Sequence, residues 1–310
     1  MSARLIKQVF VTGASGFVGQ HLCRLVDSTP DWRAIPTSLD FDLRDEGNIA
    51  RTLDALSVPP EAVVHLAAQA SVPQSFADPD TTFDINFFGT LRLLRALKRI
   101  GFRGRFLFVS TADAYGLVDD QELPIHEDHP LHPRNPYAVS KAAAEALVYQ
   151  WSQTENIDGV IARPFNHIGP GQDDRFAVGS FARQVAGISL GKVAPVIDVG
   201  DIDAMRDFTD VRDVARAYLA LLSHGERGCV YNVGSGSEVR VGDILQRLLE
   251  LANVDARVVG DPARLRPAEQ KRMRADTRRL RDATGWLPSI EWDQTLIDTL
   301  NDWKRRLTHE

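Results

Sequence analysis

Apolar positions along the N-terminal half of the chain follow two alternating patterns. Short runs rich in Val, Ile and Phe are typical of strands, and longer stretches with apolar side chains three or four residues apart are typical of helices, as Val18, Leu22 and Leu25 illustrate. Strands separated by helices predict βαβ units, and therefore an α/β fold with a doubly wound parallel sheet. The expected strands are 7–13, 33–38, 62–68, 105–111 and 159–164, and the expected helices are 17–28, 46–57, 81–99 and 137–154.

The pattern changes after Pro164. Residues 166–174 have the composition of a loop, a helix is expected near 176–190, and residues 206–223 resemble the end of a strand followed by a helix. The run CVYNVGSG at 229–236 predicts one more strand, which returns to the main sheet. The chain is therefore expected to cross between a larger domain and a smaller C-terminal α/β domain more than once. The expected division is 1–165 plus about 207–234 for the larger domain, and about 166–206 and 235–310 for the smaller one.

The composition is that of an ordinary folded protein in water. The 310 residues are 44% hydrophobic and 25% charged, which suffices for one large core or two unequal ones. The start, MSARLIKQVF, lacks the apolar region of a secretion signal, and no apolar run approaches the roughly 20 residues that span a bilayer. We therefore expect a cytoplasmic protein with no membrane contact. Cys23 and Cys229 lie in apolar segments without ligand spacing, so both are interpreted as structural thiols, and no metal site is expected.

Charge is unevenly distributed along the chain. The formal net charge of −6 argues against general affinity for nucleic acid. Between Arg257 and Arg281, however, nine Arg or Lys residues accompany three acidic ones, so this stretch carries about +6 and the remainder about −12. A local anionic ligand would suit this positive charge, although a solvated basic helix face accounts for most of the same side chains.

A glycine-rich motif follows the first expected strand. TGASGFVG at 12–19 places Gly13, Gly16 and Gly19 between that strand and the first helix. Glycines at this spacing allow a tight turn and let the backbone approach a pyrophosphate, which then lies at the N-terminus of the helix. A glycine-rich turn without a ligand is the alternative, but the position after an N-terminal strand favours a dinucleotide site and a sheet of Rossmann type.

The residues that would select the dinucleotide leave its identity open. An acid that binds the ribose hydroxyls usually follows the second strand, where this chain has PTSLDFDL at 36–43. Asp40 is a candidate for that role, while Thr37 and Ser38 can accommodate a phosphate, although no arginine stands immediately beside them. Asp42 is expected at the adenine edge, and Asp45 is expected to cap the next helix. NAD and NADP therefore both remain possible.

A tyrosine and a lysine stand four residues apart in NPYAVSK at 135–141. This spacing places Tyr137 and Lys141 on one face at the start of a helix. The ammonium group can then depress the pKa of the phenol and hold a cofactor ribose while the phenol donates a proton. A surface pair is the usual alternative, but the glycine turn and Thr111 at the end of an intervening strand favour a catalytic site.

Five motifs together resemble those of the extended short-chain dehydrogenases/reductases that act on sugar nucleotides. These are TGASGFVG, HLAA, DINFFGT, STADAYG and PYAVSK, and the resemblance covers about residues 7 to 285. It implies Thr111, Tyr137 and Lys141 as catalytic residues, and NADP(H) or NAD(H) as cofactor, with NADPH slightly favoured. The implied cofactor-binding residues are Gly13, Ser15, Gly16, Phe17, Val18, Gly19, Ser38, Asp42, Leu43, Leu66, Ala67, Ala68, Asn86, Tyr137, Lys141 and Pro164.

A narrower resemblance comes from LPIHEDHPLHPRNPYAVSK, ARPFNHIGPGQ, VGDIDAMRDFTDVRDV and DPARLRPAEQ. These segments are similar to those of 4-ketoreductases that form GDP-6-deoxy-D-mannose (GDP-D-rhamnose), which are relatives of GDP-mannose 4,6-dehydratase. The similarity implies a GDP-sugar substrate bound largely by the smaller domain, with arginines on its diphosphate. His167, by contrast, is expected to be packed or bonded to backbone. The implied substrate-binding residues are Thr111, Ala112, Asp113, Asn166, Arg206, Arg264 and Glu269.

The same three catalytic residues serve reduction, dehydration and epimerisation, so they do not decide the reaction. A 4,6-dehydratase needs an additional base, for which its family keeps a glutamate two residues before the strand-end tyrosine; here that position is Asp113. The shorter side chain favours the ketoreductase, with the dehydratase, an epimerase and a 6-deoxytalose-forming reductase as alternatives. A dinucleotide-sensing regulator without catalysis is a remote alternative, because both Tyr137 and Lys141 are present.

The expected helices at 81–99 and 137–154 carry apolar residues around much of their circumference. One face of a single sheet would not cover all of them. The residues concerned include Phe83, Phe87, Phe88, Leu91, Leu94, Ala142, Ala146 and Trp151. The family resemblance implies that these helices pair with a second copy in a homodimer.

Overall fold

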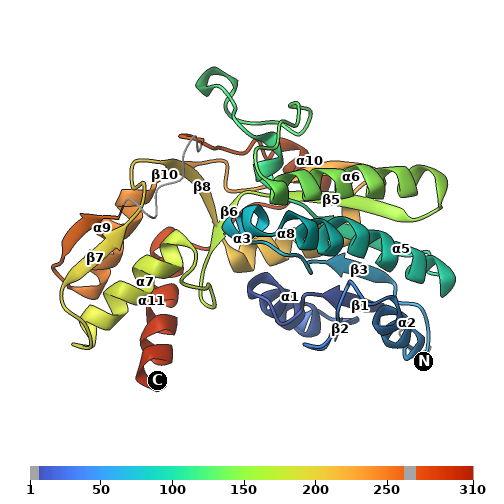
Figure 1. Ribbon diagram of the computed structural model, residues 1–310, viewed down its shortest axis with the longest axis horizontal. Coiled ribbons are helices and arrows are strands. Elements are labelled where there is room, and N and C mark those ends of the chain that lie inside the picture. The colour runs from blue at the N-terminus through green and yellow to red at the C-terminus, as the bar shows by residue number, and fades with distance from the viewer. Residues whose placement is uncertain (1–6, 262–269, 310) are drawn as a thin grey trace.

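A six-stranded parallel sheet forms the centre of the larger part of the molecule. The computed structural model describes residues 7–261 and 270–309. The strand order is β2-β1-β3-β4-β5-β9, and every neighbouring pair is parallel (Figure 1). The strands are β1 Lys7–Thr12, β2 Trp32–Pro36, β3 Ala62–His65, β4 Arg105–Val109, β5 Asp158–Pro164 and β9 Val230–Val233. The predicted α/β fold with a doubly wound parallel sheet is confirmed.

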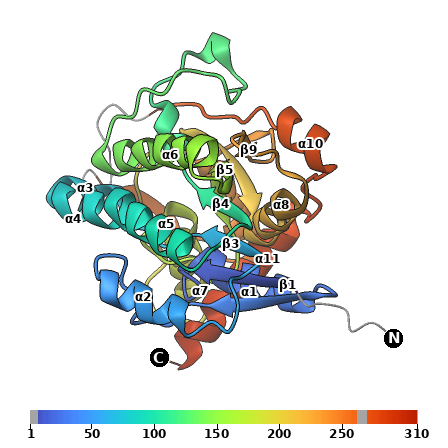
Figure 2. The same cartoon turned by 90° about the vertical axis from the view of Figure 1, so that its right-hand side faces the viewer.

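Helices cover both faces of this sheet (Figure 2). Leu22 and Val26 of α1 share one apolar core with Tyr218 and Leu221 of α8, whereas α2, α5 and α6 pack on a second core against the opposite face. The helices around the sheet are α1 Phe17–Ser28, α2 Glu46–Asp54, α3 Val72–Ala77, α4 Pro79–Phe83, a π-helical turn η1 Asp84–Phe88, α5 Gly89–Arg99, α6 Pro136–Thr154 and α8 Val211–His224. Such layering on both sides explains why the central strands are almost wholly apolar.

A second, smaller assembly surrounds its own core. It contains a three-stranded sheet in the order β10-β8-β6 and a two-stranded sheet of β11 and β7. Helices α7, α9 and α11 enclose an apolar core that is separate from the two cores of the large sheet. The strands are β6 Asn166–Ile168, β7 Val196–Val199, β8 Met205–Asp210, β10 Glu238–Arg240 and β11 Arg257–Gly260, and the helices are α7 Ala177–Ser189, α9 Val241–Ala252 and α11 Trp292–His309. Helix α10 Arg278–Thr284 packs instead on α8 and β9, with Leu280 in the core shared by α1 and α8.

The chain enters the second assembly and leaves it again, as expected. Strand β8 belongs to the three-stranded sheet, α8 then packs on α1, β9 joins β5 in the large sheet, and β10 returns to β8. The strand predicted at 229–236 is thus confirmed as the outermost strand of the large sheet. The residue boundaries of the two domains remain a prediction. None of the helices in the described ranges has both the length and the apolar character needed to cross a bilayer.

The single helix predicted at 81–99 is three consecutive elements instead. Asp78 caps α4 by accepting from the backbone N of Thr81, and Pro79 occupies its first position. The π-helical turn η1 then separates α4 from α5, with Asn86 buried inside it. A π turn is a single-turn, local change from i→i+4 to i→i+5 hydrogen bonding, and a segment of five residues is too short for the apolar pattern to reveal it.

Candidate active site

The glycine motif forms a close-packed turn between β1, α1 and the end of β3. Gly13 has φ +68°, and a Cβ there would lie 2.7 Å from the backbone N of Ala67. A Cβ on Gly19 would lie 2.2 Å from the carbonyl oxygen of Gly13, so no larger residue fits. Gly16 is the N-cap of α1, and no side chain caps this helix end. The first backbone N–H groups of α1 can therefore bind an anion.

The loop after β2 has an arginine engaged with one of the predicted acids. Arg44 forms a two-pronged contact with Asp42, with its Nε 3.0 Å from Oδ1 and its Nη2 2.8 Å from Oδ2. This contact lowers the pKa of the Asp42 carboxyl group. Asp45 accepts from the backbone N atoms of Gly47 and Asn48, which confirms its predicted role as a helix cap. Arg44 thus pairs with the acid that was predicted at the adenine edge, a contact that the sequence did not indicate.

Thr111 and Tyr137 meet at the end of β4. Thr111 follows this strand and caps the 3₁₀ turn η2 (Ala112–Tyr115) by accepting from the backbone N of Asp113 at 3.2 Å. Tyr137 lies in the first turn of α6, where Pro136 and the N-cap Asn135 start the helix. The side chains of Thr111 and Tyr137 lie close enough for the Thr111 hydroxyl to lower the pKa of the phenol. The two hydroxyl groups can therefore act on a single oxygen atom of a substrate.

The electrostatics of the pair Tyr137 and Lys141 are set mainly by burial. Burial raises the pKa of Tyr137, the carboxylate of Asp113 raises it further, and the nearby hydroxyl of Thr111 lowers it. Lys141 is 3% exposed, with its Nζ 4.4 Å from the centroid of the Phe108 ring. Burial lowers the pKa of Lys141 to about 7, although the carboxylate of Glu145 raises it. Within the protein alone, Lys141 therefore balances between its charged and neutral forms near neutral pH.

His65 supports the site from inside the sheet, and sequence analysis did not single it out. Its ring is hydrogen-bonded to the hydroxyls of Thr12 at 2.7 Å and Thr90 at 3.0 Å. Thr90 already donates to the backbone O of Asn86, so the Nε2 atom of His65 carries the proton and Nδ1 accepts from Thr12. Burial lowers the pKa of His65 to about 3, so the ring is neutral. The ring fixes the register between β1 and β3, where Thr12 pairs with His65.

Asn86 braces the site through protein contacts. Its Oδ1 accepts from the backbone N of Gln69 at 2.8 Å, and its Nδ2 donates to the backbone O of Gln69 at 3.0 Å and to Ser140 Oγ at 2.9 Å. Ser140 precedes Lys141 on α6, so Asn86 joins the loop after β3 to the catalytic helix. These contacts support a positioning role for Asn86 within the predicted cofactor site.

The predicted substrate residues within the described ranges lie on elements of both assemblies. Ala112 is buried in η2, Asn166 is exposed at the start of β6, and Arg206 is 7% exposed on β8. Arg206 donates to the backbone O atoms of Met205 and Lys271, at 3.0 and 3.2 Å. The predicted residues Arg264 and Glu269 lie outside the described residues.

His167 is packed and bonded to backbone, as predicted. Its Nδ1 is 3.1 Å from the carbonyl oxygen of Phe165. Its ring stacks on Phe17, with centroids 5.9 Å apart and an interplanar angle of 16°. Phe17 is the first residue of α1, so this contact joins the smaller assembly to the predicted cofactor site.

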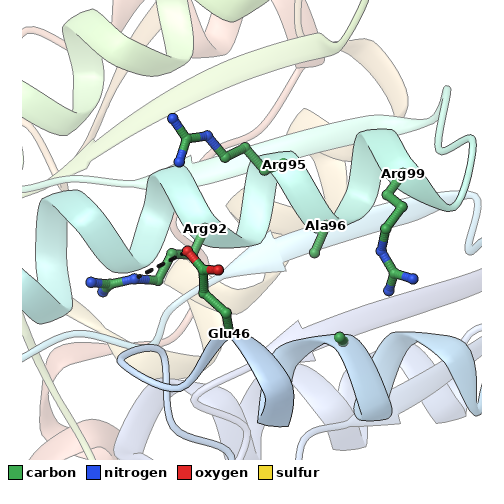
Figure 3. Close-up of a pocket in the computed structure, with 6 residues that line it drawn as sticks. Glu46, Arg92, Arg95, Ala96 and Arg99 are labelled. Atoms are coloured by element: carbon green, nitrogen blue, oxygen red, sulfur yellow. Dashed lines mark ion pairs between the residues drawn. The ribbon is translucent and has the colours of Figure 1, made fainter.

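A groove on the outside of the large sheet lies apart from these residues. Figure 3 shows it between α2 and α5, with Glu46, Arg92, Arg95 and Arg99 along its rim. Arg92 pairs with Asp84 at 2.8 Å and approaches Glu46 at 3.9 Å, while Arg99 pairs with Asp54 at 2.8 Å. Most of the positive charge of the groove is therefore already neutralised. None of the predicted catalytic or substrate residues lines the groove.

The described residues fit a nicotinamide dinucleotide. The glycine turn is a cradle that any Cβ at Gly13 or Gly19 would fill, and the uncapped N-terminus of α1 lies beside it. Thr111 follows the carboxyl end of β4, where ligands bind in open α/β sheets, and Tyr137 and Lys141 lie in the first two turns of α6. The turn would hold the diphosphate, and Lys141 would hold the ribose next to the nicotinamide.

Comparison with known proteins agrees with this geometry. The family model of GDP-mannose 4,6-dehydratase matches residues 36–299. The chain belongs to this family. Among curated members related to the chain, the GDP-6-deoxy-D-mannose reductase of Pseudomonas aeruginosa is 49% identical over 307 residues, which cover 99% of this chain and 100% of the reductase. A GDP-mannose 4,6-dehydratase of Vibrio cholerae is 29% identical over 83% of this chain and 76% of the dehydratase.

Solved structures extend the comparison within the family and its relatives. The structure of RMD from Pseudomonas aeruginosa complexed with NADPH has a TM-score of 0.92 and 49% sequence identity, and the match covers 97% of this chain and 99% of that one. The UDP-glucose 4-epimerase of Thermus thermophilus in complex with NAD has a TM-score of 0.83 and 30% identity over 96% of this chain and 99% of that one. The predicted family resemblance is confirmed.

Proposed function

We propose that this protein reduces the C4 ketone of GDP-4-dehydro-6-deoxy-D-mannose to GDP-6-deoxy-D-mannose, with a nicotinamide dinucleotide as cofactor. The observation that carries the proposal is the complete set of groups needed for ketone reduction, Thr111, Tyr137 and Lys141, in a chain 49% identical to a GDP-6-deoxy-D-mannose reductase. NADPH is the preferred cofactor in this proposal, because the structure of RMD, at the same 49% identity, holds NADPH.

The residues of this chain divide the reaction among three tasks. The bound nicotinamide supplies the hydride that reduces the ketone. Thr111 hydrogen-bonds the carbonyl oxygen of the substrate and orients it. Tyr137 donates a proton to the same oxygen as it becomes an alcohol, and the ammonium group of Lys141 stabilises the tyrosinate that remains. Burial of Lys141 strengthens this last interaction, because charges attract more strongly where water is excluded.

Asp113 favours this reaction over dehydration. It lies in η2, beside Tyr137 closely enough for its charge to raise the pKa of the phenol. A dehydratase would need a carboxylate that reaches the sugar carbons, and aspartate is shorter than glutamate by about 1.3 to 1.5 Å, a displacement that can cost on the order of a hundredfold in rate. Asp113 is therefore suited to raise the pKa of the Tyr137 phenol rather than to remove the C5 proton of the sugar.

A direct assay tests the proposed function. Purified protein is mixed with NADPH and GDP-4-keto-6-deoxy-mannose prepared enzymatically, and the absorbance of the reduced nicotinamide is followed. We expect oxidation of NADPH that depends on both the protein and the ketosugar. NMR coupling constants of the sugar ring then distinguish the rhamnose product from its 4-epimer. Absence of NADPH oxidation would refute the reductase, and conversion of GDP-mannose by the protein alone would establish the dehydratase.

The proposal includes a homodimer formed through the outer face of α3, η1 and α6. Large apolar side chains are exposed there: Phe76 at 63%, Phe88 at 47% and Tyr149 at 53%. Leu94 and Trp151 were predicted among the apolar residues that the dimer covers, but they do not belong to this face, because both are buried against the sheet of their own chain. The proposal also places the protein in the cytoplasm, which suits its two free thiols, Cys23 and Cys229.

A further inference from the structure

A network of buried polar side chains adjoins the catalytic residues, and the mechanism above does not use it. Its centre is Arg163, near the end of β5, which is 5% exposed. The guanidinium group forms a bidentate ion pair with the carboxylate of Glu145, with Nε 3.0 Å from Oε1 and Nη2 2.6 Å from Oε2. Its Nη1 donates to Tyr115 OH and to the backbone O of Glu127, each at 3.0 Å. Together with a contact from Nε to Oε2 of Glu145 at 3.1 Å, five hydrogen bonds compensate the burial of this charge.

Tyr115 connects this network to the turn that carries Thr111. Tyr115 is fully buried as the last residue of η2, and Thr111 caps the other end of the same turn. The hydroxyl of Tyr115 donates to Asn232 Oδ1 on β9 at 2.7 Å. The guanidinium carbon of Arg163 lies 5.0 Å from the centroid of the tyrosine ring. One end of the catalytic turn is therefore fixed to β5 and β9.

Glu145 connects the network to the helix that carries Tyr137 and Lys141. Lys141 and Glu145 are four residues apart on α6, the usual spacing of an ion pair within a helix. Among the described ion pairs, however, Glu145 pairs with Arg163 at 2.6 Å and not with Lys141. Glu145 is 4% exposed, so water cannot replace Arg163 as the hydrogen-bond partner of its carboxylate if the arginine is removed.

We propose that Arg163 is a positioning residue for ketone reduction. It holds the turn with Thr111 against the helix with Tyr137, and it occupies Glu145 so that the ammonium group of Lys141 stays available for the cofactor ribose. This inference rests on the proposed function. It assigns Arg163 no contact with substrate or cofactor. It does require that loss of Arg163 changes both turnover and cofactor binding.

The central experiment compares Arg163→Met with a matched control, Arg105→Met. Arg105 at the start of β4 also forms an ion pair with a carboxylate, 2.8 Å from Asp158 at the start of β5, whereas Arg163 lies near the opposite end of β5. For folded Arg163→Met we expect kcat to fall on the order of a hundredfold with the KM for the ketosugar little changed, because the reacting groups lose their alignment. The control should keep kcat within about twofold. Wild-type kcat in folded Arg163→Met would refute the positioning role.

A second variant tests the role of Glu145 separately. In Arg163→Met the freed carboxylate can pair with Lys141, so the dissociation constant of NADPH should rise about tenfold, as expected for one lost charged hydrogen bond. The double variant Arg163→Met/Glu145→Gln should bind NADPH nearly as tightly as the wild type. Unchanged NADPH binding in the single variant, or no recovery in the double one, would overturn this part of the inference. Titration of NADPH fluorescence gives these constants even in the absence of turnover.

Tyr115→Phe keeps the test valid if Arg163→Met does not fold. This change removes one hydroxyl and leaves the apolar packing of the ring intact. We expect kcat to fall about tenfold with unchanged NADPH binding, because only the link to the Thr111 turn is weakened. An unchanged kcat would refute that link. A wild-type protein without reductase activity would refute the proposed function instead, and NADPH binding by the Arg163 variants would still decide the inference.

Discussion

The hydroxyl of Thr111 lies close enough to Tyr137 to lower the pKa of its phenol, although the two residues belong to different elements, the end of β4 and the first turn of α6. Each is held by a cap: Thr111 caps η2, and Asn135 accepts from the backbone N of Ala138 at 2.7 Å to start α6. The two hydroxyls are therefore preorganised before any substrate arrives, and replacing either one should affect chemistry rather than folding.

Tyr137→Phe should remove the proton donor and leave the fold intact. We expect kcat to fall by about 10² to 10⁴, the usual contribution of a positioned general acid. The dissociation constant of NADPH should change by less than about threefold, because Lys141 and the glycine turn are retained. Steady-state kinetics and fluorescence titration measure the two quantities. A variant that retains more than half of the wild-type kcat would exclude Tyr137 as the donor.

The buried Lys141 should make stability depend on pH in a defined direction. Its pKa is lowered to about 7 in the folded protein, so between that value and its ordinary range the unfolded chain binds the extra proton and stability rises with pH. Lys141→Met removes this dependence. The free energy of unfolding of the variant minus that of the wild type should therefore be about 2 kcal/mol larger at pH 6 than at pH 9, which means that the substitution stabilises the protein more at pH 6. Denaturant unfolding at both values measures the difference.

The charged and titratable groups around Lys141 support this assignment. His65 stays neutral over that pH range, because its pKa is lowered to about 3. Glu145 is paired with Arg163, and burial raises the pKa of Tyr137. If the difference in free energy of unfolding between the wild type and Lys141→Met is the same at pH 6 and pH 9, Lys141 keeps an ordinary pKa.

Asp113 and Thr111 should shift the pH profile of kcat in opposite directions. The charge of Asp113 raises the pKa of Tyr137, so Asp113→Asn should move the alkaline limb of kcat to lower pH. The hydroxyl of Thr111 lowers the same pKa, so Thr111→Val should move the limb to higher pH while also lowering kcat. Shifts in the same direction for both variants would contradict these electrostatic roles.

Gly19→Ala should abolish cofactor binding. The added Cβ would lie 2.2 Å from the carbonyl oxygen of Gly13, so the turn has to move away from its present position. Gly260→Ala is the matched control, because a Cβ at Gly260 has no heavy atom within 4 Å and the residue has no positive φ. We expect NADPH affinity to fall by about a hundredfold or more in the first variant and to stay at the wild-type value in the control. Equal affinities would show that the turn tolerates a side chain.

The proposed homodimer predicts a monomer when its apolar face is charged. Phe88→Glu/Tyr149→Glu places two carboxylates on side chains that are about half exposed in a single chain, so folding should not be affected. Light scattering at micromolar protein should give a dimer mass for the wild type and a monomer mass for the variant. A monomeric wild type would refute the dimer.

The sequence was most informative where local chemistry and local structure coincide. Helix α1 has the predicted bounds, 17–28, because Gly16 both ends the phosphate turn and starts the helix. Tyr137 and Lys141 are one turn apart on α6, as predicted, because their spacing is a property of the helix alone. The predicted return of the chain at 229–236 also followed from a short apolar run, which pairs with β5.

Contacts between residues that are far apart in the sequence could not be predicted. Sequence analysis named neither Arg163 nor His65, because their partners lie elsewhere: Tyr115 is 48 residues from Arg163, and Thr12 is 53 residues from His65. The short strands β6 and β10 have three residues each and carry too few positions for a periodic pattern. Such contacts arise only when the sheet order brings the strands together.

The path of the chain between its two sheets limits how such a protein can be recombined. Strands β8 and β10 belong to the small sheet, but α8 and β9 between them belong to the large one. A single genetic crossover between relatives would therefore pair β5 of one parent with β9 of the other, or β8 of one parent with β10 of the other, and bring together strands whose side chains did not evolve together. New sugar specificities in this architecture should therefore arise by point substitution within one lineage rather than by exchange of whole domains.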